Sequence, residues 1–134
     1  MDVTKALDTL RAEAPGCALV AFTDLSTGLV LSSSAAGAVG QEELDVLALA
    51  AQDVLLGTVG EGAQALFAGG TEMPPGTGIT LTRKEARVYL RSPAGGFEAL
   101  ACLCAPGADL GTVAARGRET LEAILFGHGA GEGG

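Results

Sequence analysis

The sequence has few of the residues with which proteins bind nucleic acids. It contains no tryptophan, one tyrosine and four phenylalanines in 134 residues, whereas single-stranded nucleic acid is held by stacking on aromatic side chains. Basic residues are scarce too: residues 1–82 hold ten acids but only Lys5 and Arg11, and the net charge is −8. Such a chain repels phosphate backbones and anionic membrane surfaces. We expect no nucleic-acid binding; the charge favours solubility and is compatible with a basic surface on a partner.

Long hydrophobic stretches are absent as well. No apolar run approaches the roughly 18 residues of a membrane-spanning helix. Acidic Asp2 lies at an N-terminus that lacks the hydrophobic region of a signal peptide. The length suits one domain that can bury a core. The sequence therefore predicts a single domain over residues 1–126, no membrane insertion, and a disordered glycine-rich tail over residues 127–134.

Histidine and cysteine are too few to favour a metal site. The only histidine is His128, in the glycine-rich tail, and Cys17, Cys102 and Cys104 lie in apolar runs. A structural zinc ion needs four nitrogen or sulfur ligands, while free cysteine is among the most buried residue types. We therefore expect three small core residues with free thiols, a reducing cytoplasmic location, and no metal or other cofactor.

Catalytic motifs are missing too. The chain has no G-x-x-x-x-G-K-[ST] phosphate loop, no H-E-x-x-H and no G-x-S-x-G. Ser32, Ser33 and Ser34 have no plausible base nearby in sequence and are expected to form a solvated loop. The acids at 42, 43 and 45 are expected from the dipole of a helix N-terminus rather than from acid–base chemistry. The sequence predicts a protein without enzymatic activity.

Hydrophobic periodicity predicts the order helix, two strands, helix, three strands, helix. Turn residues such as Pro15-Gly16 separate these elements. A further helical turn or two is possible at 61–68. The expected elements are helix Asp2–Ala14, strands Cys17–Thr23 and Leu29–Ser33, helix Gln41–Gly57, strands Ile79–Thr82, Ala86–Ser92 and Phe97–Cys104, and a last helix from about Asp109 to Phe126.

The character of the strands predicts their order in the sheet. Cys17–Thr23 and Phe97–Cys104 are continuously apolar, as is typical of strands buried on both faces, so we place them side by side at the centre. Leu29–Ser33 flanks the first through a hairpin and Ala86–Ser92 flanks the second. Ile79–Thr82 then becomes an edge strand whose free N–H and C=O groups a second chain could pair.

The helix Gln41–Gly57 is apolar over too much of its surface to cover one core. A surface helix needs an apolar stripe of only about 100°. The side with Leu44, Leu47 and Ala51 can be assigned to the sheet, but Val46, Leu49 and Leu56 then remain exposed. We expect a second subunit to bury that side.

A second surface of interest is the strand face with Arg87, Tyr89 and Arg91. These side chains could contact phosphate or the carboxylates of a partner. The favoured alternative is a solvated strand face that packs loosely under a helix.

The order of these landmarks resembles the Roadblock family of dynein light chains and bacterial GTPase regulators. The resemblance covers about residues 3–126. It rests on Pro15-Gly16, on Asp24 and Thr27-Gly28 in the hairpin, on the apolar helix over 41–57, on the three-strand meander, and on Asp109-Leu110-Gly111 at the start of the last helix.

The resemblance implies an α+β fold, α-β-β-α-β-β-β-α, in which a five-stranded antiparallel sheet forms a three-layer sandwich. The middle helix covers one face and the terminal helices cover the other. It also implies homodimers or heterodimers in which the middle helices pack together and the third strands join into one sheet. Carried onto this chain, the interface residues are Val46, Leu49, Ala50, Asp53, Leu56, Ile79 and Leu81.

The function implied is that of a non-enzymatic regulator or scaffold that acts as a homodimer and binds a small Ras-like GTPase. Arg83, Arg87 and Arg116 are candidate but unsupported arginine fingers. The alternative is a small-molecule sensor with a pocket between sheet and helices, which the three cysteines could line.

Overall fold

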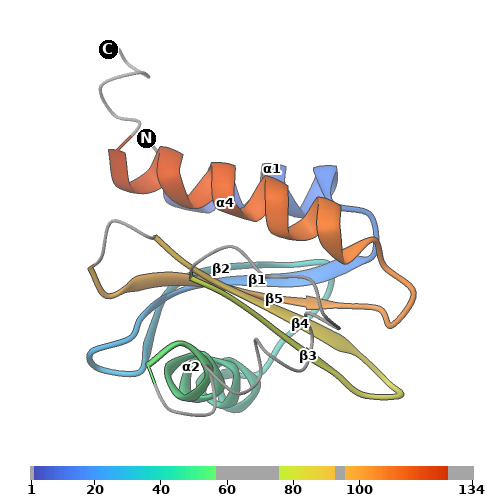
Figure 1. The fold of residues 1–134 in the computed structure, drawn as a ribbon, viewed down its shortest axis with the longest axis horizontal. Coiled ribbons are helices and arrows are strands. Elements are labelled where there is room, and N and C mark those ends of the chain that lie inside the picture. Colours follow the sequence, from blue (N-terminus) through green and yellow to red (C-terminus); the bar gives the residue numbers. More distant parts are fainter. Residues whose placement is uncertain (1, 57–75, 93–95, 127–134) are drawn as a thin grey trace.

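A computed structural model describes residues 2–56, 76–92 and 96–126. The predicted order of helices and strands is confirmed, and the layers are those of the implied sandwich (Figure 1). The possible helical turn at 61–68, most of the turn after Ser92, and the tail at 127–134 lie outside the described residues. The elements are α1 (Val3–Glu13), β1 (Cys17–Asp24), β2 (Leu29–Ala35), α2 (Gln41–Leu56), β3 (Thr77–Leu81), β4 (Ala86–Arg91), β5 (Glu98–Cys104) and α4 (Leu110–Phe126).

The five strands form one antiparallel sheet in the order β2-β1-β5-β4-β3. The two continuously apolar strands, β1 and β5, lie next to each other at the centre, as predicted. Val20 faces Cys102 and Ala21 faces Ala101 across this pair. Apolar side chains on both faces of the central strands require helices on both faces of the sheet.

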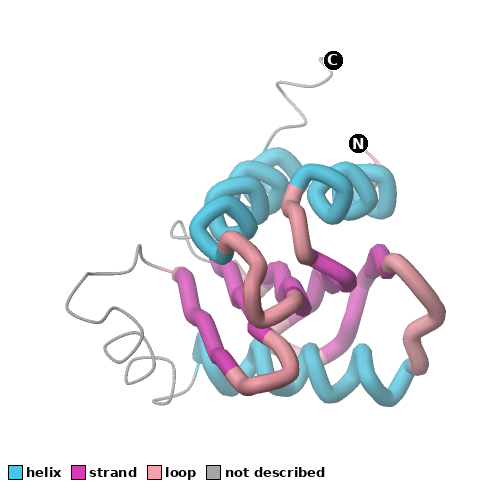
Figure 2. Tube along the Cα trace, turned by 90° about the vertical axis from the view of Figure 1, so that its right-hand side faces the viewer, coloured by secondary structure: helices cyan, strands magenta, loops and turns pink. Residues whose placement is uncertain are grey.

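Two separate hydrophobic cores fill the space between the sheet and its helices. One lies beneath α1 and α4, which run side by side (Figure 2). The other lies beneath α2, the helix that the described part of the chain places on this face. On α4, Val113, Gly117 and Leu121 are buried. Among the described residues, no helix is long and apolar enough to span a membrane.

The expectation that Ser32 to Ser34 form a solvated loop was wrong. They belong to β2, which continues to Ala35. Ser34 is buried against α1, where it donates a hydrogen bond to the carboxylate of Asp8 and accepts one from Arg11 Nε at 3.0 Å. Polar residues on α1 thus satisfy the hydroxyl group of Ser34. Because this end of β2 is polar, it lacks the alternation of apolar residues by which strands are recognised. The third strand lies where it was predicted, although β3 begins two residues earlier, at Thr77, and ends at Leu81.

Gly16 allows the sharp turn between α1 and β1. Its φ is +87°, and a Cβ there would lie 2.7 Å from Ala108 Cβ in the loop before α4. Backbone with positive φ is accessible to glycine at no steric cost. The backbone at Gly16, just before β1, is therefore packed closely against Ala108 in the loop that leads into α4.

Gly16→Ala is expected to lower the free energy of unfolding by about 1–3 kcal/mol, because a methyl group both strains the backbone and meets Ala108. Urea denaturation monitored by circular dichroism measures this. Gly107→Ala is the matched control: a Cβ at Gly107 meets nothing within 4 Å, so its effect should stay within about 0.5 kcal/mol. Equal effects of the two substitutions would contradict the assignment.

Candidate functional site: the outer face of the middle helix

The outer face of α2 carries a stripe of exposed apolar side chains. Val46, Leu49 and Leu56 have exposed fractions of 53, 55 and 43 %. Leu47 and Ala51 on the opposite side are buried against the sheet. The predicted division of this helix between the sheet and an uncovered side is therefore confirmed for the single chain. We refer to Val46, Leu49 and Leu56, with Asp53 between the last two, as the α2 stripe.

The spacing within the α2 stripe is that of a helix–helix contact. Its members follow one another at intervals of three, four and three residues. This is the interval that keeps side chains on one seam between two packed helices. The sequence therefore places four adjoining side chains on one exposed line along α2.

Hydrogen bonds and close packing fix α2 on the sheet. At its start, the side chain of Glu43 accepts a hydrogen bond from the backbone N–H of Gly40 at 3.4 Å. Further along, Gln52 Nε2 donates to the backbone oxygen of Leu25 at 2.8 Å, which joins α2 to the hairpin between β1 and β2. Gly28 in that hairpin lies directly beside Leu49, since a Cβ there would be 3.1 Å from Leu49 Cδ2. The stripe is thus held by a rigid support.

The structure brings most of the predicted interface residues to the surface. Ala50, on the flank of the α2 stripe, is half-buried, and Leu81 on β3 is 52 % exposed. Ile79 is the exception, because its side chain is 9 % exposed and belongs to the core beneath α1 and α4. Only its backbone lies at the sheet edge. Among the described residues, β3 pairs with β4 alone.

The face with Arg87, Tyr89 and Arg91 is not the loosely packed, solvated surface that the sequence suggested. Tyr89 is 1 % exposed and belongs to the core beneath α2. Arg91 is the last residue of β4, at the opposite end from Arg87. Its guanidinium lies 5.7 Å from the centre of the Phe97 ring. The aromatic ring of Tyr89 covers sheet surface that small residues on β5, such as Ala99 and Ala101, leave open.

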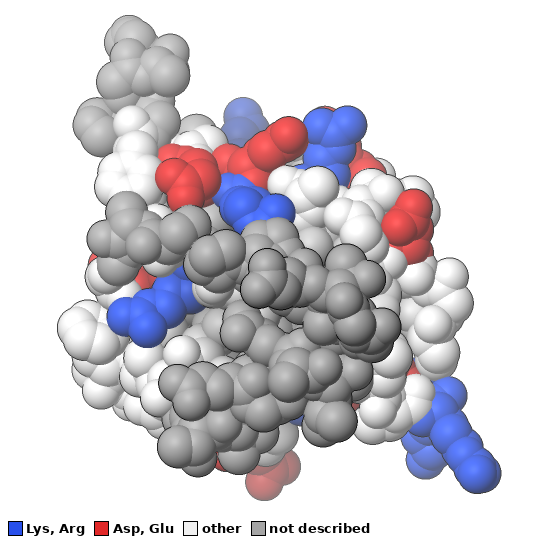
Figure 3. Space-filling view, in the orientation of Figure 1, with Lys and Arg blue, Asp and Glu red and all other residues white. Residues whose placement is uncertain are grey.

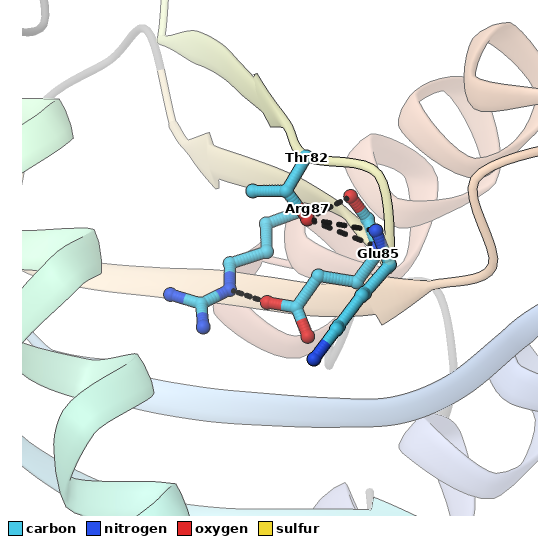
Figure 4. Close-up of polar contacts among 4 residues, drawn as sticks. Thr82, Glu85 and Arg87 are labelled. Carbon is cyan, nitrogen blue, oxygen red and sulfur yellow. Dashed lines mark hydrogen bonds and ion pairs between the residues drawn. The ribbon is translucent and has the colours of Figure 1, made fainter.

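Arg87 is held within a polar corner at the turn between β3 and β4 (Figure 4). Its Nε donates to Glu85 Oε2 at 2.6 Å. Thr82 Oγ1 orders the turn by accepting the backbone N–H of Lys84 at 3.2 Å and that of Glu85 at 3.1 Å. Burial by itself lowers the pKa of Arg87, yet hydrogen bonds to Tyr89 and Glu85 outweigh it and raise the pKa above its ordinary value. The sequence analysis did not identify Glu85 as the partner of Arg87. The spacing could have indicated it, because residues two apart in extended backbone lie on the same face.

The other two arginines named as candidate fingers are not gathered on α2. Arg116 pairs with Glu119 at 3.2 Å on α4, which covers the opposite face of the sheet. Arg83 is exposed in the turn between β3 and β4. Figure 3 shows acidic and basic side chains interspersed around the terminal helices, so no patch of a single sign dominates that side of this view.

The three cysteines are buried core residues with free thiols, as predicted. They lie in the core beneath α1 and α4, so they do not line a pocket next to α2. Hydrogen bonding with Cys17 and burial raise the pKa of both Cys102 and Cys104. Within the described residues, no cluster of three or more metal-ligating side chains could hold an ion.

Comparison with solved structures identifies the fold. The Roadblock/LC7 domain from Streptomyces avermitilis superposes with a TM-score of 0.70 at 17 % identity, over 93 % of this chain and 96 % of that one. MglB in a tetrameric arrangement gives 0.66 at 21 % identity, over 91 % and 84 %. Myxococcus xanthus MglB gives 0.63 at 17 %, over 92 % and 94 %. No family model matches the sequence, and a search of curated proteins finds no match. The chain therefore has the Roadblock fold, which confirms the resemblance at the level of the fold.

The thiols of Cys102 and Cys104 should resist alkylation in the folded protein. A thiol reacts as the thiolate, and a raised pKa with burial suppresses that form. With iodoacetamide at pH 8, we expect labelling of Cys102 and Cys104 to be at least about a hundredfold slower in buffer than in denaturant. Mass spectrometry of the tryptic peptide that spans residues 92–116 reports on both. Equal rates in the two solvents would show that these thiols are accessible.

Proposed function

We propose that this protein is a non-enzymatic regulator or scaffold that works as a homodimer and binds a small Ras-like GTPase. The observation that carries the proposal is the α2 stripe, because three large apolar side chains on a rigid helix remain exposed in the single chain. Contiguous exposed apolar surface of this kind marks sites of protein contact. The Roadblock fold supports the choice of partner, through the resemblance described above.

In the proposed dimer, two α2 helices pack against each other along their stripes. The β3 edges of the two subunits then lie close together and can pair by backbone hydrogen bonds. Leu81 would contribute its side chain to this contact and Ile79 only its backbone, since Ile79 is buried. One protein of the same fold has been described in a tetrameric arrangement, which supports self-association of such domains.

In this scheme the protein regulates the GTPase by positioning the groups of the GTPase and not by contributing catalytic residues. The two α2 helices would present a two-fold surface that can seat one asymmetric partner. None of the three candidate arginines, Arg83, Arg87 and Arg116, lies on α2, the helix that we propose to face the partner, and Arg87 and Arg116 pair with Glu85 and Glu119. A GTPase-activating effect would therefore arise from orienting the partner's own catalytic groups. The free thiols suit the reducing cytoplasm in which we place the protein.

Leu49→Asp should weaken the dimer, because a carboxylate in an apolar helix contact is desolvated without a partner. We expect the dissociation constant to rise at least about tenfold, with Leu56→Asp acting in the same way. Sedimentation equilibrium measures the change. Both positions are exposed in the single chain, so the circular dichroism spectrum should stay the same.

Phe126→Asp provides the matched control, since Phe126 is 51 % exposed but lies on α4, which covers the opposite face of the sheet. It should leave the dissociation constant unchanged. A chain that is monomeric at micromolar concentration, or a mass unaffected by both stripe substitutions, would rule out this interface.

Single-turnover GTP hydrolysis tests the choice of partner. A Ras-like GTPase from the same cell should either bind the protein or hydrolyse GTP faster in its presence, and Leu49→Asp should reduce both effects by at least about tenfold. Absence of binding and of any rate change would eliminate the GTPase while leaving the dimer intact.

A further inference from the structure

A cleft of about 310 Å³ lies next to the first turns of α2, between that helix and strands β1, β4 and β5. Its walls combine apolar and charged side chains in equal number. The lining residues are Leu19, Glu42, Glu43, Val46, Leu47, Glu85, Arg87 and Leu103.

The apolar half of the cleft is its inner wall. Leu19 on β1 and Leu47 on α2 are buried, and Leu103 on β5 is half-buried. Val46 stands at the outer lip and is also the first residue of the α2 stripe. The cleft therefore opens beside the surface to which we assign protein binding.

The charged half of the cleft is acidic. Three carboxylates face one guanidinium, which gives a net charge of −2 for the lining residues. Arg87 Nε is already paired with Glu85 Oε2 at 2.6 Å, so the charge of Arg87 is compensated within the cleft and two carboxylates remain without a basic partner there. Glu42 and Glu43 are exposed in the first turn of α2. A ligand that enters the cleft therefore meets their negative charge.

We propose that this cleft receives a lysine or arginine side chain from the partner protein that is seated on the two paired α2 helices. Both residues have an aliphatic stem that packs on apolar surface and a charged end that stays in a polar setting. The stem would lie against Leu19 and Leu103, and the charged end would meet Glu42 and Glu43. The inference rests on the proposed binding of a partner to the paired α2 helices and adds the chemistry of that partner, whose surface is basic.

A nuclear magnetic resonance titration tests the cleft directly. The probe is Nα-acetyl-arginine amide, and Nα-acetyl-norleucine amide supplies a similar stem without the charge. We expect saturable shifts of the amides of Leu19, Glu43, Val46 and Leu103 with the arginine probe, and at least about fivefold weaker binding of the norleucine probe. Equal responses to both probes, or no saturable response to the arginine probe, would overturn the proposal.

Two variants separate charge from shape. Glu42→Gln with Glu43→Gln should weaken arginine binding by at least about fivefold through loss of charge. Leu103→Phe should weaken it to a similar extent by filling the cleft without a change of charge. Since Glu42 and Glu43 are exposed, the double variant is expected to fold, and a thermal melt verifies this.

The matched control removes two acids from other faces, by Glu13→Gln with Glu119→Gln, and should bind the arginine probe as before. Equal weakening in the control would show that net charge alone attracts the probe, which overturns the site. The titration needs no GTPase. A positive titration together with a negative GTPase assay would therefore remove the proposed partner and keep the cleft.

Discussion

The structure depends on a central pair of strands, β1 and β5, that is apolar on both sides. Neither face of these strands can be left to water, so helices must cover both faces of the sheet. Among the described residues, α1 and α4 share one face and α2 covers the other. The inner side of α2 is fixed against the sheet, and the α2 stripe lies on its outer side. The cleft lies next to the first turns of the same helix.

Polar contacts decide where each helix sits. On the face covered by α1 and α4, Ser34 on β2 bonds to Asp8 and Arg11 of α1. On the face covered by α2, Gln52 of α2 bonds to the backbone of Leu25. Apolar packing is nearly non-directional, and these hydrogen bonds give each helix a defined position. The precision matters on the α2 side, because a contact between two copies needs the stripe to be held at a fixed height above the sheet.

The outer side of α2 combines two kinds of surface within a short distance. The stripe is apolar and suits a partner that is buried against it. The cleft is acidic at its rim and suits a basic side chain. Burial of the apolar stripe would supply affinity. The charged cleft beside it would discriminate between partners, because charge complementarity mainly governs partner choice and association rate. The strong acidic character of the first 82 residues, which hold ten acids, thus has a local counterpart in the rim of the cleft.

Much of the fold could be predicted from the sequence because hydrophobic periodicity is a local signal. The order of the helices and strands along the chain, and the order of the strands in the sheet, followed from where apolar residues recur. Ser34 was misjudged because its polar partners lie on α1, far away in the chain. Tyr89 was misjudged because its burial depends on α2 and on small residues of β5 that only the fold brings together. Ile79 was assigned to the interface by its strand, yet its side chain is buried in the core beneath α1 and α4, whereas Leu81, two residues further along, is exposed.

The sequence by itself determined that α2 carries more apolar surface than one core can use, since helical geometry fixes which residues share a side. It also determined that the thiols are core residues and that catalytic motifs are missing. Only the tertiary structure decided which part of that apolar surface stays exposed, because this depends on how α2 rests on the sheet. The cleft was likewise beyond the sequence: its walls come from α2, β1, β4 and β5, and no local pattern records the packing of four separate segments.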